Sequence, residues 1–140
     1  MKFKASVEAV DVTSANGARE KDPLMSMIMC LLHSRTNTQI MHWTTRSYAT
    51  HIALAGYYEE IGDLLDPFVE AFQGKYGILY DFFEDYKIAQ DPVKYMKYLA
   101  SEVETLRRKE RFPADSELQN QVDGIAYLID STMYKLKFLS

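Results

Sequence analysis

Apolar side chains recur at spacings of three and four along four stretches of this 140-residue chain. Such spacing places them on one face of an α-helix. The pattern predicts helices over residues 23–43, 48–72, 92–106 and 116–139. The second stretch shows it most fully, at Ile52, Leu54, Ala55, Tyr58, Ile61, Leu65, Phe68, Val69 and Phe72.

Residues typical of helix ends bound these stretches. Asp22-Pro23 and Asp91-Pro92 each provide an N-cap followed by a proline at the first helical position, and Ser47 is an N-cap for the second helix. Pro67 lies inside that helix and indicates either a bend or a new helical start. The glycines of QGKYG are expected to end it, and the aromatic stretch over residues 77–90 predicts a short connecting helix.

These elements predict an all-α protein, a four-helix bundle with a short extra helix between the second and third long helices. Residues 11–22 (DVTSANGAREKD) are polar and carry an Asn16-Gly17 turn signal, and residues 1–22 are expected to form an N-terminal extension. Residues 23–140 are expected to form the bundle domain.

Composition narrows the class of protein. With 47% hydrophobic residues and a net charge of −4, the chain is expected to fold as one acidic globular domain, which argues against nonspecific nucleic-acid binding by its body. Its one cysteine, Cys30, lies in an apolar run and is expected in the core, so a reducing, cytoplasmic setting fits. No signal peptide and no membrane span are expected.

The candidate chemistry lies in two histidines and a set of acids. His42 and His51 bracket the first predicted turn, and the acids that follow share one face of the second helix: Glu59, Asp63, Asp66 and Glu70. A solvated helix face explains these acids, and a histidine bonded at a helix end explains each histidine. The other interpretation is a metal site, because imidazole and carboxylate ligands suit ferrous iron, zinc or manganese.

Helix length restricts the metal interpretation. Asp66 and Glu70 follow His51 by 15 and 19 residues, which is about 22 to 28 Å of helix. They cannot bind one ion together within a chain. A shared site therefore requires two copies whose second helices run antiparallel, as in a two-fold dimer.

The same residues resemble a known family. His42-Trp43, His51, Asp66 and Glu70 look like the ferroxidase signature of Dps, the mini-ferritins that protect DNA in starved cells. The resemblance covers about residues 24–139. The segments HWTTRSYATH and QGKYG are also similar to short Dps-like proteins carried by tailed phages.

This resemblance implies a ferritin-like bundle that forms two-fold dimers, often assembled into a hollow dodecamer. It implies a ferroxidase site at the dimer interface, where His42 and His51 of one chain and Asp66 and Glu70 of the other bind iron and carry its oxidation. Iron storage and oxidative protection would follow, in the cytoplasm, or in the host cytoplasm if the protein is phage-borne. The family has an acid four residues after the second histidine, where this chain has Ala55; Glu59 is a candidate substitute ligand.

Two other functions stay open. Ala55 and the many aromatic residues favour a ferritin-like shell or interaction protein without catalysis. DNA binding is the third possibility, and it rests on one basic cluster, Arg107, Arg108, Lys109 and Arg111. A helix C-terminus explains that cluster equally well.

Overall fold

A computed structural model describes residues 21–84 and 86–139 of the chain. In this part the protein has four long helices and no strand: α2 (Pro23–Thr44), α3 (Tyr48–Tyr76), α4 (Pro92–Arg107) and α5 (Ser116–Phe138). The expected all-α four-helix bundle is confirmed at this level. None of these helices has the length and apolar character needed to cross a membrane.

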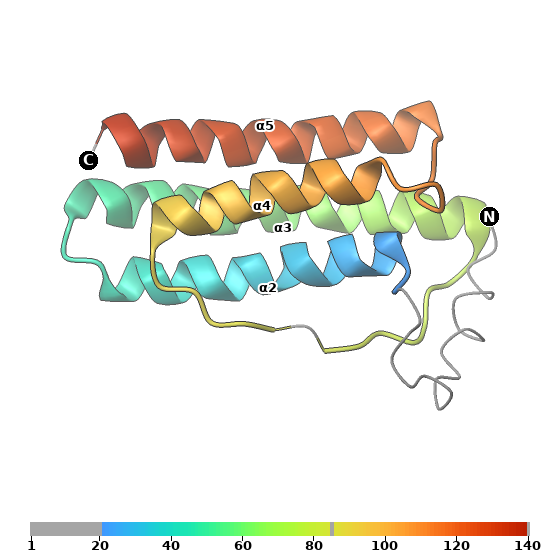
Figure 1. Cartoon of the computed structure of the whole chain (residues 1–140), viewed down its shortest axis with the longest axis horizontal. Coiled ribbons are helices and arrows are strands. Elements are labelled where there is room, and N and C mark those ends of the chain that lie inside the picture. Colours follow the sequence, from blue (N-terminus) through green and yellow to red (C-terminus); the bar gives the residue numbers. More distant parts are fainter. Residues whose placement is uncertain (1–20, 85, 140) are drawn as a thin grey trace.

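The helices form two antiparallel hairpins joined by one long crossing. Helices α2 and α3 form the first hairpin and α4 and α5 the second, while α3 also packs on α5 and α2 on α4. Figure 1 shows the connection over residues 77–91 running back along the bundle, outside α2, from the end of α3 to the start of α4. This crossing leaves α3 and α4 parallel to each other.

The helix starts confirm the capping residues expected from the sequence. The side chains of Asp22, Ser47 and Asp91 each accept a hydrogen bond from a backbone N–H of the first turn, at 2.8, 3.2 and 3.1 Å. Such bonds satisfy N–H groups that the helix itself leaves unpaired. Helix α3 continues through Pro67 to Tyr76, so no new helix begins at that proline.

The core holds the apolar faces of all four helices. Its largest fully buried side chains include Tyr57, Phe68 and Phe72 of α3, and Cys30 is buried among them as expected. The hydroxyl of Tyr57 lies 2.7 Å from Oγ of Ser34, which in turn donates to the carbonyl of Leu31 at 2.6 Å. Burial raises the pKa of Tyr57 far above its ordinary value, so this phenol stays protonated.

The short helix expected over residues 77–90 is absent: the described residues of this segment are extended. Gly77 and Asp81 have φ of 106° and 86°, outside the helical region. Side chains supply hydrogen bonds that a helix would have made internally, since Gln73 accepts from the N–H of Leu79 at 2.9 Å. The prediction was wrong because partners on the long helices, Gln73 of α3 and Asn37 of α2, outweigh a weak local preference for helix. The predicted extension lies outside the described residues, except for its last two positions.

Candidate functional site

The two histidines of the predicted site lie in contact. His42 is in the last turn of α2 and His51 in the first turn of α3, and their rings stack with centroids 3.6 Å apart and planes 14° from parallel. The turn between them is short because Ser47 caps α3 at once, and its own N–H bonds Oγ1 of Thr45 at 3.2 Å. The hairpin therefore brings together residues nine positions apart.

Crossed hydrogen bonds fix the orientation of both rings. Nδ1 of His42 lies 2.7 Å from the carbonyl oxygen of His51, and Nδ1 of His51 lies 2.8 Å from the carbonyl oxygen of His42. A carbonyl oxygen only accepts, so each Nδ1 carries a hydrogen and donates it. In the neutral ring the lone pair is then on Nε2, which is the form that binds metal ions.

Aromatic side chains surround this histidine pair. Tyr58 meets the His42 ring edge-on at 5.3 Å, and Tyr48 stacks on His51 with centroids 6.2 Å apart. Sequence reasoning placed neither tyrosine in the site. Tyr58 follows His51 by seven residues, which is two helical turns, so its position on the same face of α3 was a usable signal.

The predicted acidic ligands lie elsewhere along α3. Glu59, Asp66 and Glu70 are all exposed on this helix, and Asp66 and Glu70 are about 22 and 28 Å from His51 along its axis. Among residues 21–84 and 86–139, no group of three His, Cys, Asp or Glu side chains could hold a metal ion. One chain thus brings the histidines together and leaves the acids apart from them.

Large apolar side chains are exposed next to the histidine pair. Trp43 is 67% exposed, Tyr48 78% and Ile52 50%. Trp43 therefore does not pack in the core of this chain. Apolar groups clustered around polar ones are typical of a surface that meets another protein.

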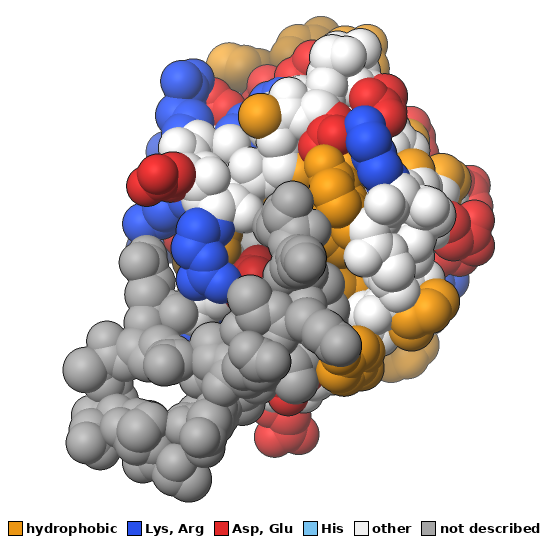
Figure 2. All heavy atoms as spheres, turned by 90° about the vertical axis from the view of Figure 1, so that its right-hand side faces the viewer, with side chains coloured by type: hydrophobic (Ala, Val, Ile, Leu, Met, Phe, Trp, Pro, Cys, Tyr) orange, Lys and Arg blue, Asp and Glu red, His pale blue; other side chains and the backbone are white. Residues whose placement is uncertain are grey.

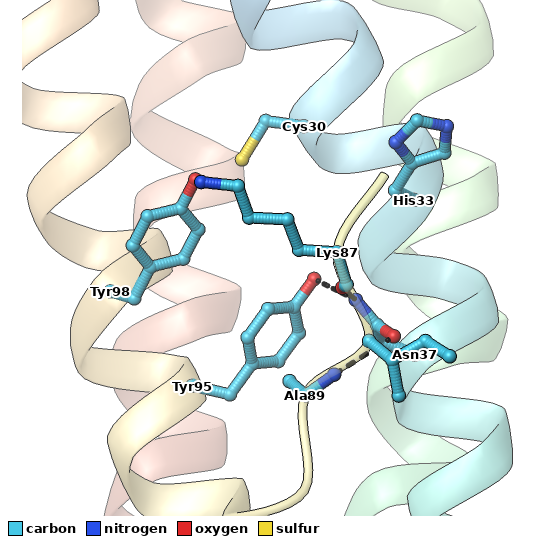
Figure 3. A pocket seen from close by; sticks show the side chains of 8 residues that line it. Cys30, His33, Asn37, Lys87, Ala89, Tyr95 and Tyr98 are labelled. Carbon is cyan, nitrogen blue, oxygen red and sulfur yellow. Dashed lines mark hydrogen bonds between the residues drawn. The ribbon is translucent and has the colours of Figure 1, made fainter. Parts of the chain in front are cut away.

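A pocket lies between α2 and α4, beneath the connection over residues 77–91, which is called the crossing segment from here on. Figure 3 shows this pocket of about 200 Å³, which includes Cys30, His33 and Tyr98 in its lining. At its floor Asn37 donates to the carbonyl of Lys87 at 2.8 Å and to the hydroxyl of Tyr95 at 3.1 Å.

The polar residues of this pocket hold the crossing segment against the bundle. The Asn37 side chain also accepts from the N–H of Ala89, at 3.4 Å. Burial raises the pKa of Tyr95 above its ordinary value, so its hydroxyl remains a neutral partner. The buried Nδ1 of His33 has no hydrogen-bond partner among the described residues, and this histidine lies apart from the His42–His51 pair.

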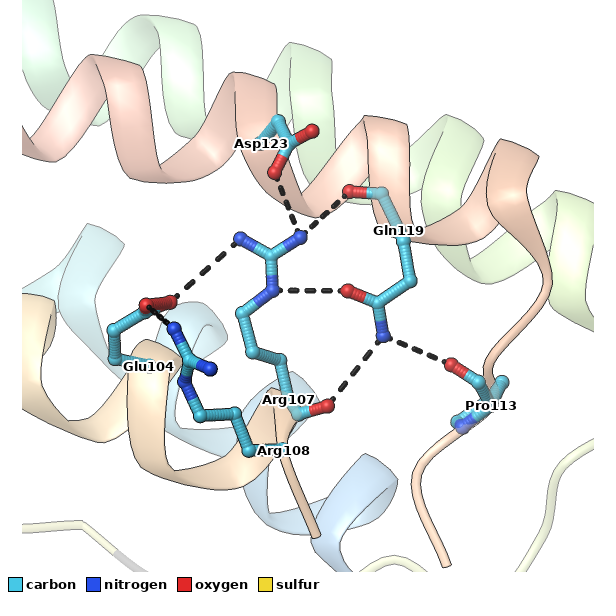
Figure 4. A network of polar contacts seen from close by, with 6 residues as sticks. All are labelled: Glu104, Arg107, Arg108, Pro113, Gln119 and Asp123. Carbon is cyan, nitrogen blue, oxygen red and sulfur yellow. Dashed lines mark hydrogen bonds and ion pairs between the residues drawn. The ribbon is translucent and has the colours of Figure 1, made fainter. Parts of the chain in front are cut away.

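In the basic cluster at the end of α4, Arg107 bonds residues of α5 and Arg108 pairs with an acid of α4 itself. Arg107 donates to Oε1 of Gln119 at 2.9 Å, to the carbonyl of Gln119 at 3.0 Å, and to Asp123 at 2.7 Å, as Figure 4 shows. Arg108 pairs with Glu104 at 2.9 Å. Figure 2, which views this end of the bundle, shows basic and acidic side chains interspersed. These contacts favour the helix-end interpretation of the cluster.

Comparison of the sequence with models of protein families assigns the chain to one family. Residues 42–136 match the model described as "Family of unknown function (DUF5856)", and the chain belongs to this family. The match begins at His42 and includes every residue of the predicted metal site. Searches of curated proteins and of solved structures each gave no match.

Proposed function

We propose that the protein is a Dps-like, ferritin-like metal-binding protein that acts as a two-fold dimer. His42 and His51 of one copy and Asp66 and Glu70 of the other would bind ferrous iron between them. The observation that carries this proposal is the histidine pair, whose crossed hydrogen bonds leave the lone pair of each neutral ring on Nε2. Zinc and manganese suit the same donor atoms.

The placement of the acids supports the two-chain form of the site. Asp66 and Glu70 are exposed on the helix that carries His51, at a distance that excludes a site within one chain. A two-fold axis near the middle of α3 would bring each histidine pair to the acids of the other copy. The exposed Trp43, Tyr48 and Ile52 would then be covered by that copy.

Each group of the site has a definite part in this proposal. The two imidazoles hold the ion as neutral ligands, the carboxylates balance its charge, and the apolar surroundings limit access of water. Oxidation of the bound ferrous ion by oxygen or peroxide would feed iron into a storage cage. Glu59 is a further candidate ligand, one helical turn beyond Ala55.

Ala55 favours a second function, a ferritin-like shell or interaction protein without catalysis. It is the residue one turn after His51, where an acid would be needed to bridge two ions. A single ion held by two histidines and two acids lacks that bridge. Under this alternative the chain forms a stable oligomer that neither binds nor oxidises iron.

Metal titration of the purified oligomer tests the proposal. Anaerobic calorimetry with Fe²⁺ or Zn²⁺ should show one ion per chain, and His51→Ala or Glu70→Ala should abolish binding. The matched controls are His33→Ala, a histidine outside the pair, and Glu60→Ala, an exposed acid of the same helix; both should bind as the wild type does. Equal binding by wild type and His51→Ala would favour the shell function.

Mixing the two defective variants tests whether the site is shared. In a dimer of one His51→Ala chain and one Glu70→Ala chain, one site keeps both histidines and both acids. Each mixed dimer should therefore bind one ion, and random mixing of equal amounts, in which about half of the dimers are mixed, should restore about a quarter of the wild-type binding if the site spans two copies. Absence of any restoration, with mixed dimers confirmed by native mass spectrometry, would contradict the shared site.

A further inference from the structure

The crossing segment exposes a row of large apolar side chains, called the apolar row from here on. The row consists of every second residue on either side of Glu84: Ile78, Tyr80, Phe82, Tyr86 and Ile88. Between them, Leu79 is buried and Phe83 and Ala89 are partly buried against the bundle. The segment therefore turns one side to the core and the apolar row to its outer surface.

The extent of the apolar row is typical of a contact surface. Ile78 and Ile88, near its two ends, are 68% and 66% exposed, and Phe82, near its middle, is 52% exposed. Single exposed apolar residues are common on protein surfaces, whereas a contiguous group of them marks a contact with another segment or molecule. An occupant of this surface has to bring apolar side chains to an extended stretch of chain.

The chain enters α2 beside the middle of the apolar row. The ammonium group of Lys21 lies 4.6 Å over the ring of Phe83, and the next residue, Asp22, caps the first turn of α2. Phe83 lies between Phe82 and Glu84, at the centre of the crossing segment. The residues that precede Lys21 therefore join the bundle at this segment.

The first nine residues have the pattern that the apolar row requires. Apolar side chains occupy the odd positions, and polar side chains occupy the even positions: Met1, Phe3, Ala5, Val7 and Ala9 against Lys2, Lys4, Ser6 and Glu8. In an extended chain alternate side chains point to opposite sides, so this stretch has one apolar and one polar side. When the apolar side lies on the row, the polar side faces water.

The lengths of the two stretches agree. At about 3.3 Å per residue, residues 78–88 span roughly 33 Å when extended and residues 1–9 roughly 26 Å. Residues 10–20 link residues 1–9 to Lys21 and reach up to roughly 36 Å, whereas either end of the row is about 17 Å from its centre. This link contains Asn16-Gly17, a dipeptide typical of turns, so the chain can reverse its direction there.

The net charges of the two stretches are opposite. Residues 77–90 contain three acids and one base, whereas residues 1–9 contain two bases, Lys2 and Lys4, and one acid. Glu84 is exposed in the middle of the apolar row. A basic stretch is attracted to this surface, whereas a second crossing segment, which is itself acidic, is repelled by it.

We propose that residues 1–9 lie extended over the apolar row of their own chain, with the odd-numbered side chains on the row. The alternating pattern, the entry of the chain beside Phe83 and the opposite charges select this occupant. The cover holds the crossing segment from outside, while Asn37 holds it from the side of the bundle. This proposal does not depend on metal binding at His42 and His51.

Labelling of an introduced thiol measures the cover in the full chain. Phe82→Cys should react with a maleimide at least about ten times more slowly than Lys97→Cys at an exposed position of α4, because labelling has to wait for the cover to open. Wild type gives the background rate, since its Cys30 is buried. Circular dichroism of each variant checks that the helices are intact.

A second substitution then removes the cover. Val7→Asp should raise the labelling rate of Phe82→Cys to that of Lys97→Cys, because a carboxylate on the apolar side opposes docking on the row. Ser6→Asp is the matched control, since it adds the same charge on the polar side and should leave Phe82→Cys protected.

Three results would overturn the proposal. Equal labelling of Phe82→Cys and Lys97→Cys would show that the apolar row is uncovered. Protection that grows with protein concentration would assign the cover to a second copy. Protection that persists in Val7→Asp would assign it to another part of the chain.

Disulfide formation tests which side of residues 1–9 meets the apolar row. Under mild oxidation at low protein concentration, Phe82→Cys should form a disulfide within one chain when it is combined with Ala5→Cys or Val7→Cys. Lys4→Cys and Ser6→Cys are the matched partners, and their thiols should link more slowly because they point away from the row. Equal rates for the two sides, or links between chains only, would contradict the proposed arrangement.

Discussion

The Nδ1 atoms of His42 and His51 fix the orientation and the proton position of both rings. Because each Nδ1 donates to a carbonyl oxygen of the facing helix, neither ring can turn over without losing a hydrogen bond. The same bonds tie the last turn of α2 to the first turn of α3. The pair therefore links the two helices, and variants at either position need a folding measurement beside any metal titration.

The buried Ser34–Tyr57 contact gives a prediction about two single-atom changes. Ser34→Ala leaves the Tyr57 hydroxyl buried without its partner, at a cost of about 1–3 kcal/mol. Tyr57→Phe removes that hydroxyl and leaves Ser34 bonded to the Leu31 carbonyl, at a cost of about 1 kcal/mol. Urea denaturation should thus find Ser34→Ala the less stable variant. The reverse order would mean that another group satisfies the Tyr57 hydroxyl.

At the scale of elements, the Asn37 side chain supplies hydrogen bonds to the crossing segment that a helix there would have made within its own backbone. The crossing segment has no helical hydrogen bonds of its own over its described residues, and Asn37 supplies partners to it from α2. Its conformation is therefore set by α2 and α4 more than by its own sequence. An aromatic-rich stretch that looks helical in isolation is extended here because the bundle offers it better contacts.

Removal of Asn37 should release this segment. In Asn37→Ala the bonds to Lys87, Ala89 and Tyr95 are lost, which leaves the Tyr95 hydroxyl short of a partner. We expect faster hydrogen exchange over residues 86–90 and a loss of about 1–3 kcal/mol of global stability. Thr36→Ala, at an exposed neighbouring position of α2, is the control and should exchange as the wild type does. Unchanged exchange in Asn37→Ala would show that the segment is held by packing instead.

At one end of the bundle, a polar cluster of Lys75, Tyr76 and Asp115 joins the end of α3 to the start of α5. Lys75 and Tyr76, at the end of α3, both bind the carboxylate of Asp115, and the tyrosine hydroxyl is 2.8 Å from each of its oxygens. The hydrogen bonds from Lys75 and Tyr76 hold the pKa of Asp115 below its ordinary value. Ionised Asp115 thus ties together helices that are far apart in sequence.

This cluster predicts a pH dependence of stability. A carboxyl whose pKa is lowered by folding stabilises the native state above its ordinary pKa of 3.8, and the contribution is lost as pH falls through the lowered value. Asp115→Asn should therefore be less stable than the wild type at pH 7, with a smaller difference at pH 3. Thermal unfolding at both values measures it, with Asp130→Asn, an exposed residue of α5, as the control. A difference that is the same at both pH values would argue against ionised Asp115 as the source.

Local sequence was sufficient for the four helices and the residues that begin them. Helical spacing and caps such as Asp22, Ser47 and Asp91 act over a few residues, so they can be read without the fold. The same arithmetic showed that His51 cannot meet Asp66 or Glu70 in one chain, and the extent of α3 agrees with it. The types of the candidate ligands also followed from sequence, whereas their use in metal binding stays a prediction.

The geometry of the histidine pair and the conformation of the crossing segment were decided by tertiary structure alone. The stacking of His42 on His51 depends on the turn between two helices, and the crossed bonds depend on the exact approach of one backbone to another ring. The extended crossing segment depends on Asn37, some fifty residues earlier in the chain. Such contacts join groups whose proximity is created by packing of the whole bundle, and no local pattern records them.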